Sequence, residues 1–399
     1  MSNSVILILN KVLIDVKILL GDYMESVKIL HTADIHIGAS ESFLGLSADK
    51  RRTETLLTFE KIVDIAFQND VKIVALAGDI FDSNKVEQRF VTAFFEKIKS
   101  CAAIKFVFAA GNHDPLNAES PFLTYDIPSN LYVLGTKDEC ITFEDLGVRV
   151  YGRSFESTYL SGEESFSLET DDTYINIMVQ HGDLKSDLSS DYNSITRKFI
   201  ENSKMDYMAL GHIHKRTEIG KIGNTYFAYC GCPEGQGFDE LEAKGVYIGD
   251  ISKNGCELEF LPVSKREHKL IKVDISECKA SAEICENILK TLNDEIGENY
   301  RENLYKIELI GEIGIDVNID TAEISNRLSN EVYFVKVKDK TEIGADFETL
   351  AKEISLKGIF VKKMLEMAEN ASETEKQSIT EALKLGLKAF SSEVKYSED

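Results

Sequence analysis

An apolar run stops abruptly at a glycine in the stretch Leu76-Ala77-Gly78-Asp79-Ile80-Phe81-Asp82. The residues before it, 71–77, are continuously apolar and rich in β-branched side chains, which is typical of a strand buried on both faces. Gly78 allows the chain to turn at once, and Asp79 then lies at the carboxyl end of the strand, where open α/β sheets bind their ligands. One aspartate in a turn is weak evidence, because turns are rich in Asp.

Four other strand-like runs end in the same way, in side chains that bind cations. The runs and the residues that follow them are Val27–Ala33 with Asp34 and His36, Ile104–Ala110 with Gly111-Asn112-His113-Asp114, Tyr174–Gln180 with His181, and Asp206–Leu210 with Gly211, His212 and His214. A single histidine is more often a hydrogen-bonded structural residue. Five of the seven histidines at the ends of strands instead predict a metal site that is assembled from loops.

The donor types fit two divalent cations, with one carboxylate able to bridge them. The candidate ligands are two carboxylates, one amide and four imidazoles: Asp34, His36, Asp79, Asn112, His181, His212 and His214. This mixture suits manganese, iron or zinc better than calcium, which prefers oxygen ligands throughout. The donor types alone leave the choice among these three metals open.

Such a pair of cations clamps a phosphoryl group and lowers the pKa of a shared water, so the expected chemistry is phosphoester hydrolysis. His113 is surplus to the ligand set and is the candidate proton donor to the leaving alkoxide, with Asp114 expected to orient its ring. Asp82 and Asp183 are weaker candidates, and we interpret both as exposed acids in turns.

Composition narrows the class of protein. With 399 residues the chain can form two or three domains. A formal net charge of −23 argues against a broad nonspecific hold on nucleic acid or on an anionic membrane. The seven cysteines are odd in number and scattered, which predicts a reducing, cytoplasmic location. The pair Cys230-Gly231-Cys232 is a weak zinc signal that we interpret as a strand-to-loop feature.

The order of predicted elements indicates an α/β (α+β) fold with two sheets packed face to face and flanked by helices. Apolar stripes of helical period over Glu54–Gln68 and Val86–Ser100 alternate with the first strands, and shorter strands follow residue 130. The predicted organisation is an N-terminal extension over 1–23, a catalytic domain over 24–263, a small α/β domain over 264–343 and a helical tail over 344–399.

The two ends of the chain leave alternatives open. Residues 4–20 are too short and too charged to span a bilayer, and we expect them to lie upstream of the working protein, which begins at Met24. An interfacial helix is the alternative. In the tail, the stripes Phe347-Leu350-Ala351-Ile354 and Ile379-Leu383-Leu387-Phe390 either pack on the chain's own core or receive the helices of a partner.

Together, the five motifs resemble the signature of the calcineurin-like metallophosphoesterases in order and spacing. The resemblance implies the two-sheet sandwich of that family, with Asp34, His36 and His214 binding the first metal and Asn112, His181 and His212 the second. It also implies a bridging role for Asp79 and a catalytic role for His113. The stretches His31–Gly38, Gly78–Asn84 and Pro233–Glu240 further resemble the SbcD/YhaO-like DNA repair exonucleases.

That narrower resemblance covers about Val27 to Val263. The small domain resembles the capping domain of those nucleases by position and pattern only. The narrower resemblance implies a DNA-end exonuclease, most simply with Mn²⁺ and with iron or zinc as alternatives. Such an enzyme works with an SbcC-like coiled-coil ATPase bound by the helical tail, with a homodimer also open. The acidic charge departs from this picture, although basic side chains near the motifs can form a local track: Arg51, Arg52, Arg153, Arg197, Lys198, Lys215 and Arg216. Two alternatives are a phosphoesterase acting on a small nucleotide and a scaffold with a structural metal.

Overall fold

The computed structural model describes residues 26–39, 44–45, 48–160, 167–314, 317, 319–344, 347–369 and 371–391. The extension predicted over 1–23 lies outside these residues. The chain divides into two compact units. The first runs to Gln236 and resumes over Glu242–Glu267, and the second comprises Gly237–Leu241 and the residues from His268 onward.

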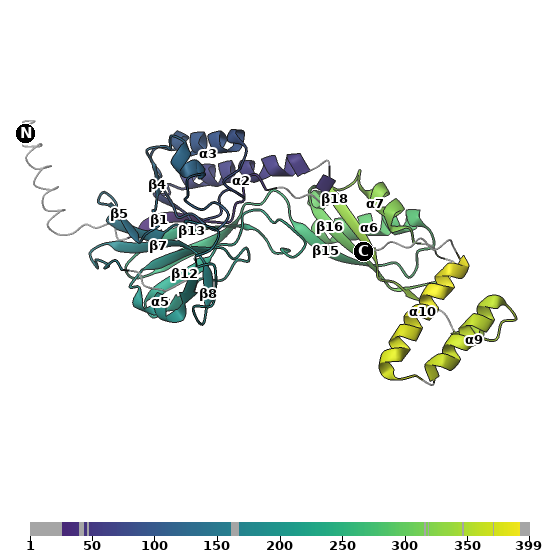
Figure 1. The fold of residues 1–399 in the computed structure, drawn as a ribbon. Coiled ribbons are helices and arrows are strands. Elements are labelled where there is room, and N and C mark those ends of the chain that lie inside the picture. Colours follow the sequence, from purple (N-terminus) through teal and green to yellow (C-terminus); the bar gives the residue numbers. More distant parts are fainter. Residues whose placement is uncertain are drawn as a thin grey trace, which may run out of the picture. The chain divides into compact units, whose positions relative to one another are not determined.

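The first unit is built on two six-stranded sheets (Figure 1). The first sheet has the order β14-β13-β1-β2-β3-β4, parallel from β1 to β4 and antiparallel at the β13–β14 edge. Its strands are β1 (Val27–Thr32), β2 (Ile73–Leu76), β3 (Lys105–Phe108), β4 (Leu131–Val133), β13 (Gly245–Ile251) and β14 (Cys256–Pro262). The run around Leu76 is thus a central strand, and all four residues of β2 are buried as its apolar sequence predicts.

The second sheet has the order β11-β12-β10-β7-β6-β5 and is likewise parallel at its centre with antiparallel edges. Its strands are β5 (Glu139–Phe143), β6 (Val148–Arg153), β7 (Ile175–His181), β10 (Tyr207–Gly211), β11 (Gly220–Ile222) and β12 (Thr225–Tyr229). A short pair, β8 (Asp183–Lys185) and β9 (Ser194–Thr196), follows β7.

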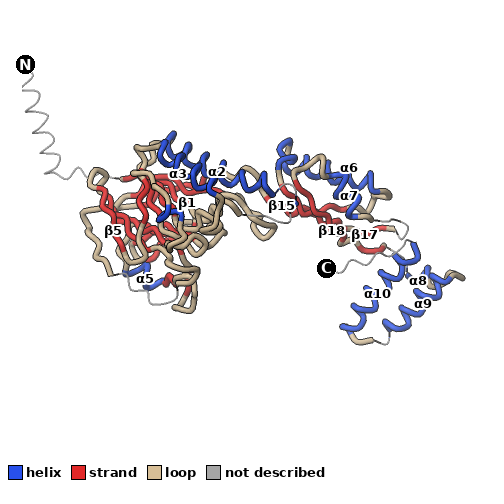
Figure 2. The backbone as a smooth tube through the Cα atoms, turned by 45° about the horizontal axis from the view of Figure 1, so that its top comes forward, coloured by secondary structure: helices blue, strands red, loops and turns tan. Residues whose placement is uncertain are grey.

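Helices cover the outer face of the first sheet, and the second sheet packs on its inner face (Figure 2). The described residues of this unit form the helices α2 (Ala48–Gln68), α3 (Gln88–Ser100), α4 (Pro121–Thr124) and α5 (Arg197–Asn202). One apolar core joins α2 and α3 to the first sheet through residues such as Phe59, Phe94 and Val74. A separate core between the sheets includes Ile29 and Ile177, so the predicted two-sheet sandwich flanked by helices is confirmed.

The second unit has a three-stranded parallel sheet in the order β15-β16-β18. Its elements are β15 (His268–Asp274), α6 (Ser281–Ile296), the 3₁₀ turn η2 (Glu298–Glu302), β16 (Leu304–Ile310), β17 (Glu312–Ile313), α7 (Thr321–Leu328), β18 (Phe334–Asp339) and β19 (Glu342–Ile343). Ile288 and Leu292 of α6 and Ile324 of α7 form one apolar core with Ile307 and Leu309 of β16.

The tail forms α8 (Phe347–Leu350), α9 (Leu356–Glu369) and α10 (Glu373–Ser391). Both predicted stripes contribute to one small core, in which Leu383 and Leu387 are buried with Val361, and Phe347 and Leu350 pack against them. Ile354, by contrast, is fully exposed. Among the described residues, no helix is both long and apolar enough to cross a membrane.

Several elements differ from the sequence-based expectations, among them the start of α2 and the edge strands β5 and β14. Helix α2 begins at Ala48, six residues before the predicted start at Glu54, because its first turns bury charged rather than apolar side chains, among them Arg51. Strand β14 was not predicted. Its sequence Cys256–Pro262 has no fully buried position, since it is an edge strand with one partner, and its apolar signal is correspondingly weak.

Candidate metal centre

The five predicted motifs meet at the carboxyl ends of β1, β2, β3, β7 and β10, where main-chain bonds join their loops. The Asp34 amide donates to the Gly78 carbonyl at 3.0 Å, and the His36 amide donates to the Asp79 carbonyl at 3.0 Å. Parallel pairing places β1 beside β2 and β7 beside β10, so the residues that follow each strand are neighbours. The sandwich then brings the two sets of loops together.

The backbone of these loops is strained at the candidate ligands. The φ angles are positive at four candidate ligands: 52° at Asp34, 50° at His36, 52° at Asp79 and 101° at His212. Residues other than glycine rarely adopt positive φ angles. Such conformations cost free energy and persist only where the surroundings impose them, most often at functional sites. The strain therefore supports a functional role for these loops.

Asp34, His36 and His214 form a first cluster whose ligand atoms all lie within 4.8 Å of one another. The Nε2 atoms of His36 and His214 face each other at 3.1 Å. Both oxygens of Asp34 accept from the His212 amide, at 3.0 and 3.1 Å, which fixes the carboxylate against the opposite loop. Two imidazole nitrogens directed at one point beside a carboxylate form a natural cation position.

A second cluster contains Asp79, His181 and His212, with Asn112 beside them. Asn112 Oδ1 lies 3.1 Å from His181 Nε2 and 3.1 Å from His212 Nδ1. Asp79 Oδ2 lies 3.2 Å from His181 Nε2, and the Asp79 carboxylate also interacts electrostatically with His36 of the first cluster. The structure thus brings all seven candidate ligands into two adjoining sets, with Asp79 facing both.

The outer nitrogens of three imidazoles face hydrogen-bond acceptors. His181 Nδ1 lies 2.8 Å from the Ala77 carbonyl, His36 Nδ1 lies 3.3 Å from Asp82 Oδ1, and His212 Nε2 lies 3.5 Å from Asp183 Oδ1. The Ala77 carbonyl keeps a proton on the outer nitrogen of His181 and leaves its inner lone pair for a metal. The two carboxylates, by contrast, lie at ion-pair distance from His36 and His212. The residues therefore fit two divalent cations, which would polarise a bound phosphoryl group and activate a water.

Burial and pairing shift the pKa values in the second cluster. Burial disfavours the charged form of Asp79, but the adjacent His181 ring holds the pKa of that carboxyl well below its usual range. Burial likewise opposes the protonation of His181, yet the Asp79 carboxylate raises its pKa to about 9. Burial and the nearby His181 lower the pKa of His212. Without metal, one proton on His181 thus neutralises Asp79, in the place that a cation would take.

His113 lies beside this centre but outside the seven candidate ligands. Its side chain is 44% exposed, and its ring packs edge-on against His36 with centroids 4.7 Å apart. His113 Nδ1 lies 3.0 Å from the Asp82 carbonyl, which leaves Nε2 available to a substrate. Its main-chain amide donates to Asp79 Oδ1 at 2.8 Å, so the same residue also holds the candidate bridging carboxylate.

Asp114 differs from its expected role. Its buried carboxylate accepts from four main-chain amides, those of Asp79, Ile80, Phe81 and Gly111, and it shows no contact with the His113 ring among the described residues. Burial and the nearby Asp79 raise the pKa of Asp114 to about 6. The expectation that Asp114 orients His113 is therefore corrected: Asp114 shapes the Asp79 loop, and the Asp82 carbonyl faces His113.

Three residues contact the candidate ligands in ways that the sequence did not indicate. Asp82 and Asp183, interpreted above as exposed acids in turns, face the outer nitrogens of His36 and His212. Asn193, which no motif marks, has a φ of 54° and donates from Nδ2 to the His181 carbonyl at 2.8 Å. Only the acidic residues could have been found from sequence, because Asp82 follows the candidate ligand Asp79 by three residues and Asp183 follows His181 by two.

Residues 27–216 match the family model described as calcineurin-like phosphoesterase, and this range contains every candidate ligand. Residues 27–216 therefore form a calcineurin-like metallophosphoesterase domain.

Curated relatives extend this similarity. The chain is 26% identical over 275 residues to the uncharacterized metallophosphoesterase YhaO of Bacillus subtilis, a match that covers 64% of this chain and 65% of that protein. It is 25% identical to the DNA double-strand break repair protein Mre11 of Saccharolobus solfataricus, over 69% of this chain and 72% of that protein. The Mre11 protein of Sulfolobus acidocaldarius is 23% identical, over 84% of this chain and 91% of that protein.

Proposed function

We propose that this protein is a Mn²⁺-dependent phosphodiesterase acting on DNA ends, with 3′→5′ exonuclease activity, in DNA repair. The observation that carries the proposal is the pair of adjoining clusters with an exposed histidine, His113, beside them. In this proposal Asp34, His36 and His214 bind one cation, Asn112, His181 and His212 bind the other, and Asp79 bridges them.

His113 acts as the general acid in the proposed reaction. Its ring is accessible, and Nδ1 is held by the Asp82 carbonyl, so Nε2 carries the proton for the leaving alkoxide. The two clusters hold the phosphodiester, and Asp34 and Asp79 supply the negative charge that keeps both cations in place. The Mre11 relatives are named as DNA double-strand break repair proteins, which supports DNA as the substrate class.

A small phosphoester is the second candidate substrate. It is favoured by the net charge of −23 and by the pairing of basic side chains near the motifs with carboxylates. Arg51 is only 1% exposed and pairs with Glu234, and Arg216 pairs with Glu218, so neither is available to a DNA backbone as a free cation. Arg197 and Lys198 on α5 are exposed. A scaffold with a structural metal is the third candidate, but it gives no role to an exposed His113.

One experiment separates the three. The protein is incubated with Mn²⁺ and either end-labelled duplex DNA or bis-p-nitrophenyl phosphate. Cleavage of both supports the exonuclease, cleavage of the small diester alone supports the second candidate, and cleavage of neither, with metal bound, supports the scaffold. Direction of digestion follows from labelling each end separately.

The catalytic role of His113 is tested with His113→Ala beside Asn112→Ala. We expect His113→Ala to lose about 10²- to 10⁴-fold in rate at unchanged metal content, because the bond to Asp79 comes from its main chain. Asn112→Ala should lose metal and activity together. Full activity of metal-loaded His113→Ala would contradict the assignment.

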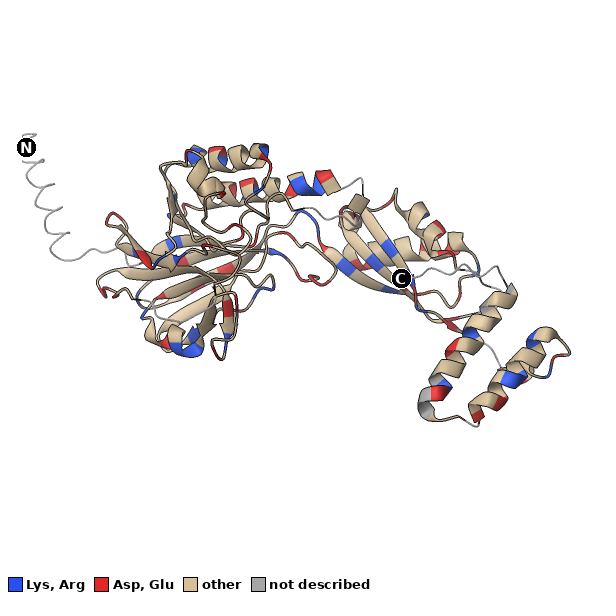
Figure 3. Cartoon of the chain, viewed as in Figure 1, with Lys and Arg blue, Asp and Glu red and all other residues tan. Residues whose placement is uncertain are grey.

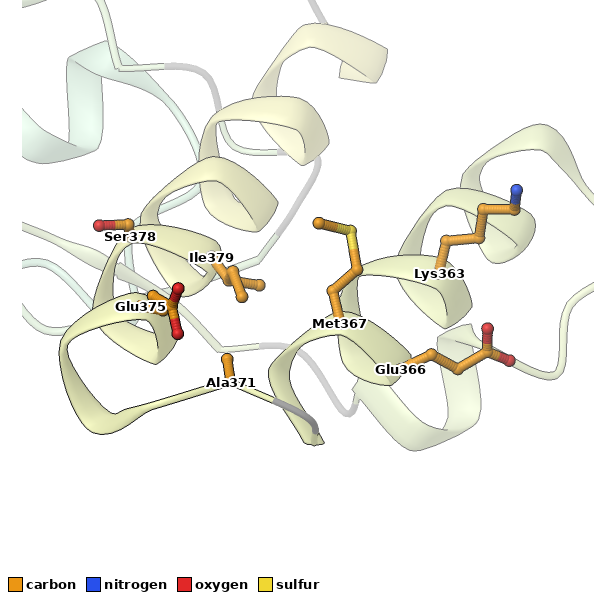
Figure 4. A pocket seen from close by; sticks show the side chains of 7 residues that line it. All are labelled: Lys363, Glu366, Met367, Ala371, Glu375, Ser378 and Ile379. Carbon is orange, nitrogen blue, oxygen red and sulfur yellow. The ribbon is translucent and has the colours of Figure 1, made fainter.

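The helical tail is the proposed docking site for an SbcC-like coiled-coil ATPase. A hollow of about 880 Å³ lies between α9 and α10, and Met367 and Ile379 point into the space between these helices (Figure 4). Leu356, Ile359 and Met367 are 74%, 57% and 57% exposed, which leaves an apolar row on α9 outside the tail's own core. Helices of a coiled coil present complementary apolar rows.

Deletion of residues 345–399 should abolish association with the ATPase and leave cleavage of bis-p-nitrophenyl phosphate intact. Ile359→Glu tests the surface more finely, because the side chain lies outside the tail core, whereas Val361→Glu on the same helix is buried and should disrupt the tail itself. Unchanged ATPase binding by Ile359→Glu would argue against this face. A cytoplasmic location and a homodimer stay predictions.

A further inference from the structure

Lys244 is a buried lysine outside the five motifs. Its side chain is 3% exposed, and its Nζ donates to the main-chain carbonyl of His214 at 2.9 Å. Glu242 Oε1 lies 3.4 Å from the same nitrogen. Lysine is among the residues least often fully buried, because removing an ammonium from water is costly. The burial of Lys244 therefore requires a specific structural role, and the residue that accepts its hydrogen bond, His214, is a candidate metal ligand.

The carbonyl of His214 accepts bonds from both Lys244 and Cys232. His214 lies outside regular strands, and the Cys232 amide and thiol also donate to its carbonyl, at the longer distances of 3.3 and 3.7 Å. A bond from a charged donor is stronger than one from a neutral group, so the Lys244 bond is the strongest of these three. Because the His214 imidazole faces His36 at 3.1 Å, a shift of this loop would open the first cluster.

The other end of Lys244 is fixed by the first sheet. Its carbonyl accepts from the amides of Val263 and Ser264 at 3.1 and 3.4 Å. The next residue, Gly245, begins β13 and pairs with Pro262 at the end of β14. The lysine thus spans from a rigid strand to an irregular loop, as residues that orient metal ligands do.

We propose that Lys244 is a positioning residue for the first cation: it holds the His214 loop so that His214 and His36 converge. The inference rests on the proposed two-metal function and concerns only the cluster of Asp34, His36 and His214. The second cluster is instead built from the loops after β2 and β3, from β7 and from the start of the Gly211–His214 loop.

The sign of the effect distinguishes positioning from simple electrostatics. Lys244 brings a positive charge toward a site for cations, so its charge alone weakens metal binding. Removing the lysine should therefore strengthen binding at both positions if only its charge matters. If it positions His214, removal should weaken the first position and leave the second one largely unchanged.

The test is Mn²⁺ binding by the full chain with Lys244→Met, which keeps the length of the side chain and removes the donor. Lys61→Met is the control for loss of a lysine that donates to a main-chain carbonyl: Lys61 lies on α2, is exposed, and its Nζ donates to the Val263 carbonyl at 2.9 Å, away from the clusters. Calorimetry gives both affinities, and the electron paramagnetic resonance spectrum distinguishes a coupled pair of Mn²⁺ ions from a single one.

For Lys244→Met we expect one of the two affinities to fall by about 10- to 100-fold and the coupled signal to be replaced by that of a single ion. His36→Ala should give the same spectrum, and Lys61→Met should match the unchanged protein. Two unchanged affinities, or two strengthened ones, in folded Lys244→Met would overturn the proposal and leave the phosphoesterase function standing. If the protein without substitutions bound no Mn²⁺, both the role of Lys244 and the proposed phosphoesterase function would be contradicted.

Lys244→Gln covers the case in which the methionine variant does not fold. Glutamine keeps an N–H donor on a shorter side chain. Lys244→Gln should therefore lower the Mn²⁺ affinity of the same single position, by less than a variant that has lost the donor completely. Equal weakening of both positions together with a lower melting temperature would indicate general destabilisation and would overturn the positioning role.

Discussion

Glycines beside the candidate ligands make room for the carboxylates and rings. A Cβ on Gly78 would collide with the His181 ring, and one on Gly111 would collide with the Asp79 carboxylate and lie 2.8 Å from the Asp79 amide. These two glycines belong to the motifs because the backbones of neighbouring loops approach each other closely, and only Gly78 also needs its positive φ of 89°.

Gly111→Ala should therefore displace Asp79 and weaken metal binding at both positions. We expect a loss of about 1–3 kcal/mol in the free energy of unfolding from overpacking, with a larger relative loss of Mn²⁺ affinity. Gly255→Ala is the control, because a Cβ there meets no atom within 4 Å. Calorimetric titration with Mn²⁺ and thermal unfolding check both variants, and normal Mn²⁺ binding by Gly111→Ala would contradict the bridging role of Asp79.

Metal binding should depend on pH through His181. Its pKa is raised to about 9 by Asp79, so below that pH a metal must displace a proton from the ring. Mn²⁺ affinity should accordingly rise by about tenfold per pH unit between pH 6 and 8, with about one proton released per metal pair. Titrations in buffers of different ionisation enthalpy measure the released protons. An affinity independent of pH would contradict the Asp79–His181 pairing.

At the scale of elements, α2 is anchored by buried charges rather than by apolar contacts alone. Arg51 Nη1 donates to Glu234 Oε2 at 2.7 Å, and Thr58 Oγ1 donates to Glu234 Oε1 at 2.6 Å. Arg266 makes two bonds to Glu54, at 2.8 and 2.7 Å. Burial favours the neutral form of Glu54, but Arg266 lowers the pKa of that carboxyl, which shows that the pair is stabilising when charged.

Arg266→Ala should destabilise the first unit by about 3–5 kcal/mol, because it removes the main partner of a buried carboxylate. Arg89→Ala, which breaks an exposed pair with Glu87, should cost no more than about 1 kcal/mol. Denaturant unfolding measures both. Since the pKa of Glu54 is lowered, the stabilisation is present above its ordinary pKa and is lost as the pH falls through the lower, folded value, so the two variants should converge in acid.

At the scale of the whole molecule, each unit has its own apolar core, and all candidate metal ligands belong to the first. Lysine and arginine are interspersed with aspartate and glutamate along both units (Figure 3). Metal should therefore stabilise the first unit alone, by about 2.7 kcal/mol at a hundredfold excess over Kd.

Calorimetric unfolding should accordingly show two transitions, of which only one shifts to higher temperature with Mn²⁺. Leu309→Ala, in the core of the second unit, should lower the other transition by about 2–5 kcal/mol and leave the metal-sensitive one in place. A single transition that moves as a whole with either change would show that the units unfold together.

The sequence by itself determined the strands that end in ligands, because a buried run such as 71–77 and the glycine and aspartate that stop it are local features. It also determined the donor types, and hence the expected pair of cations. The alternation of Val27–Ala33, Glu54–Gln68 and Val71–Ala77 predicted parallel pairing, which places successive strand ends at one edge.

Only the tertiary structure decided which groups support those ligands. Asp114 binds main-chain amides of the Asp79 loop, and Lys244 reaches the His214 carbonyl across 30 positions of sequence. Such contacts follow from how two sheets and their loops pack, and no local pattern specifies them, because a buried acid or lysine has the same sequence signal as an exposed one. The ligand types are thus a property of the sequence, and their convergence is a property of the fold.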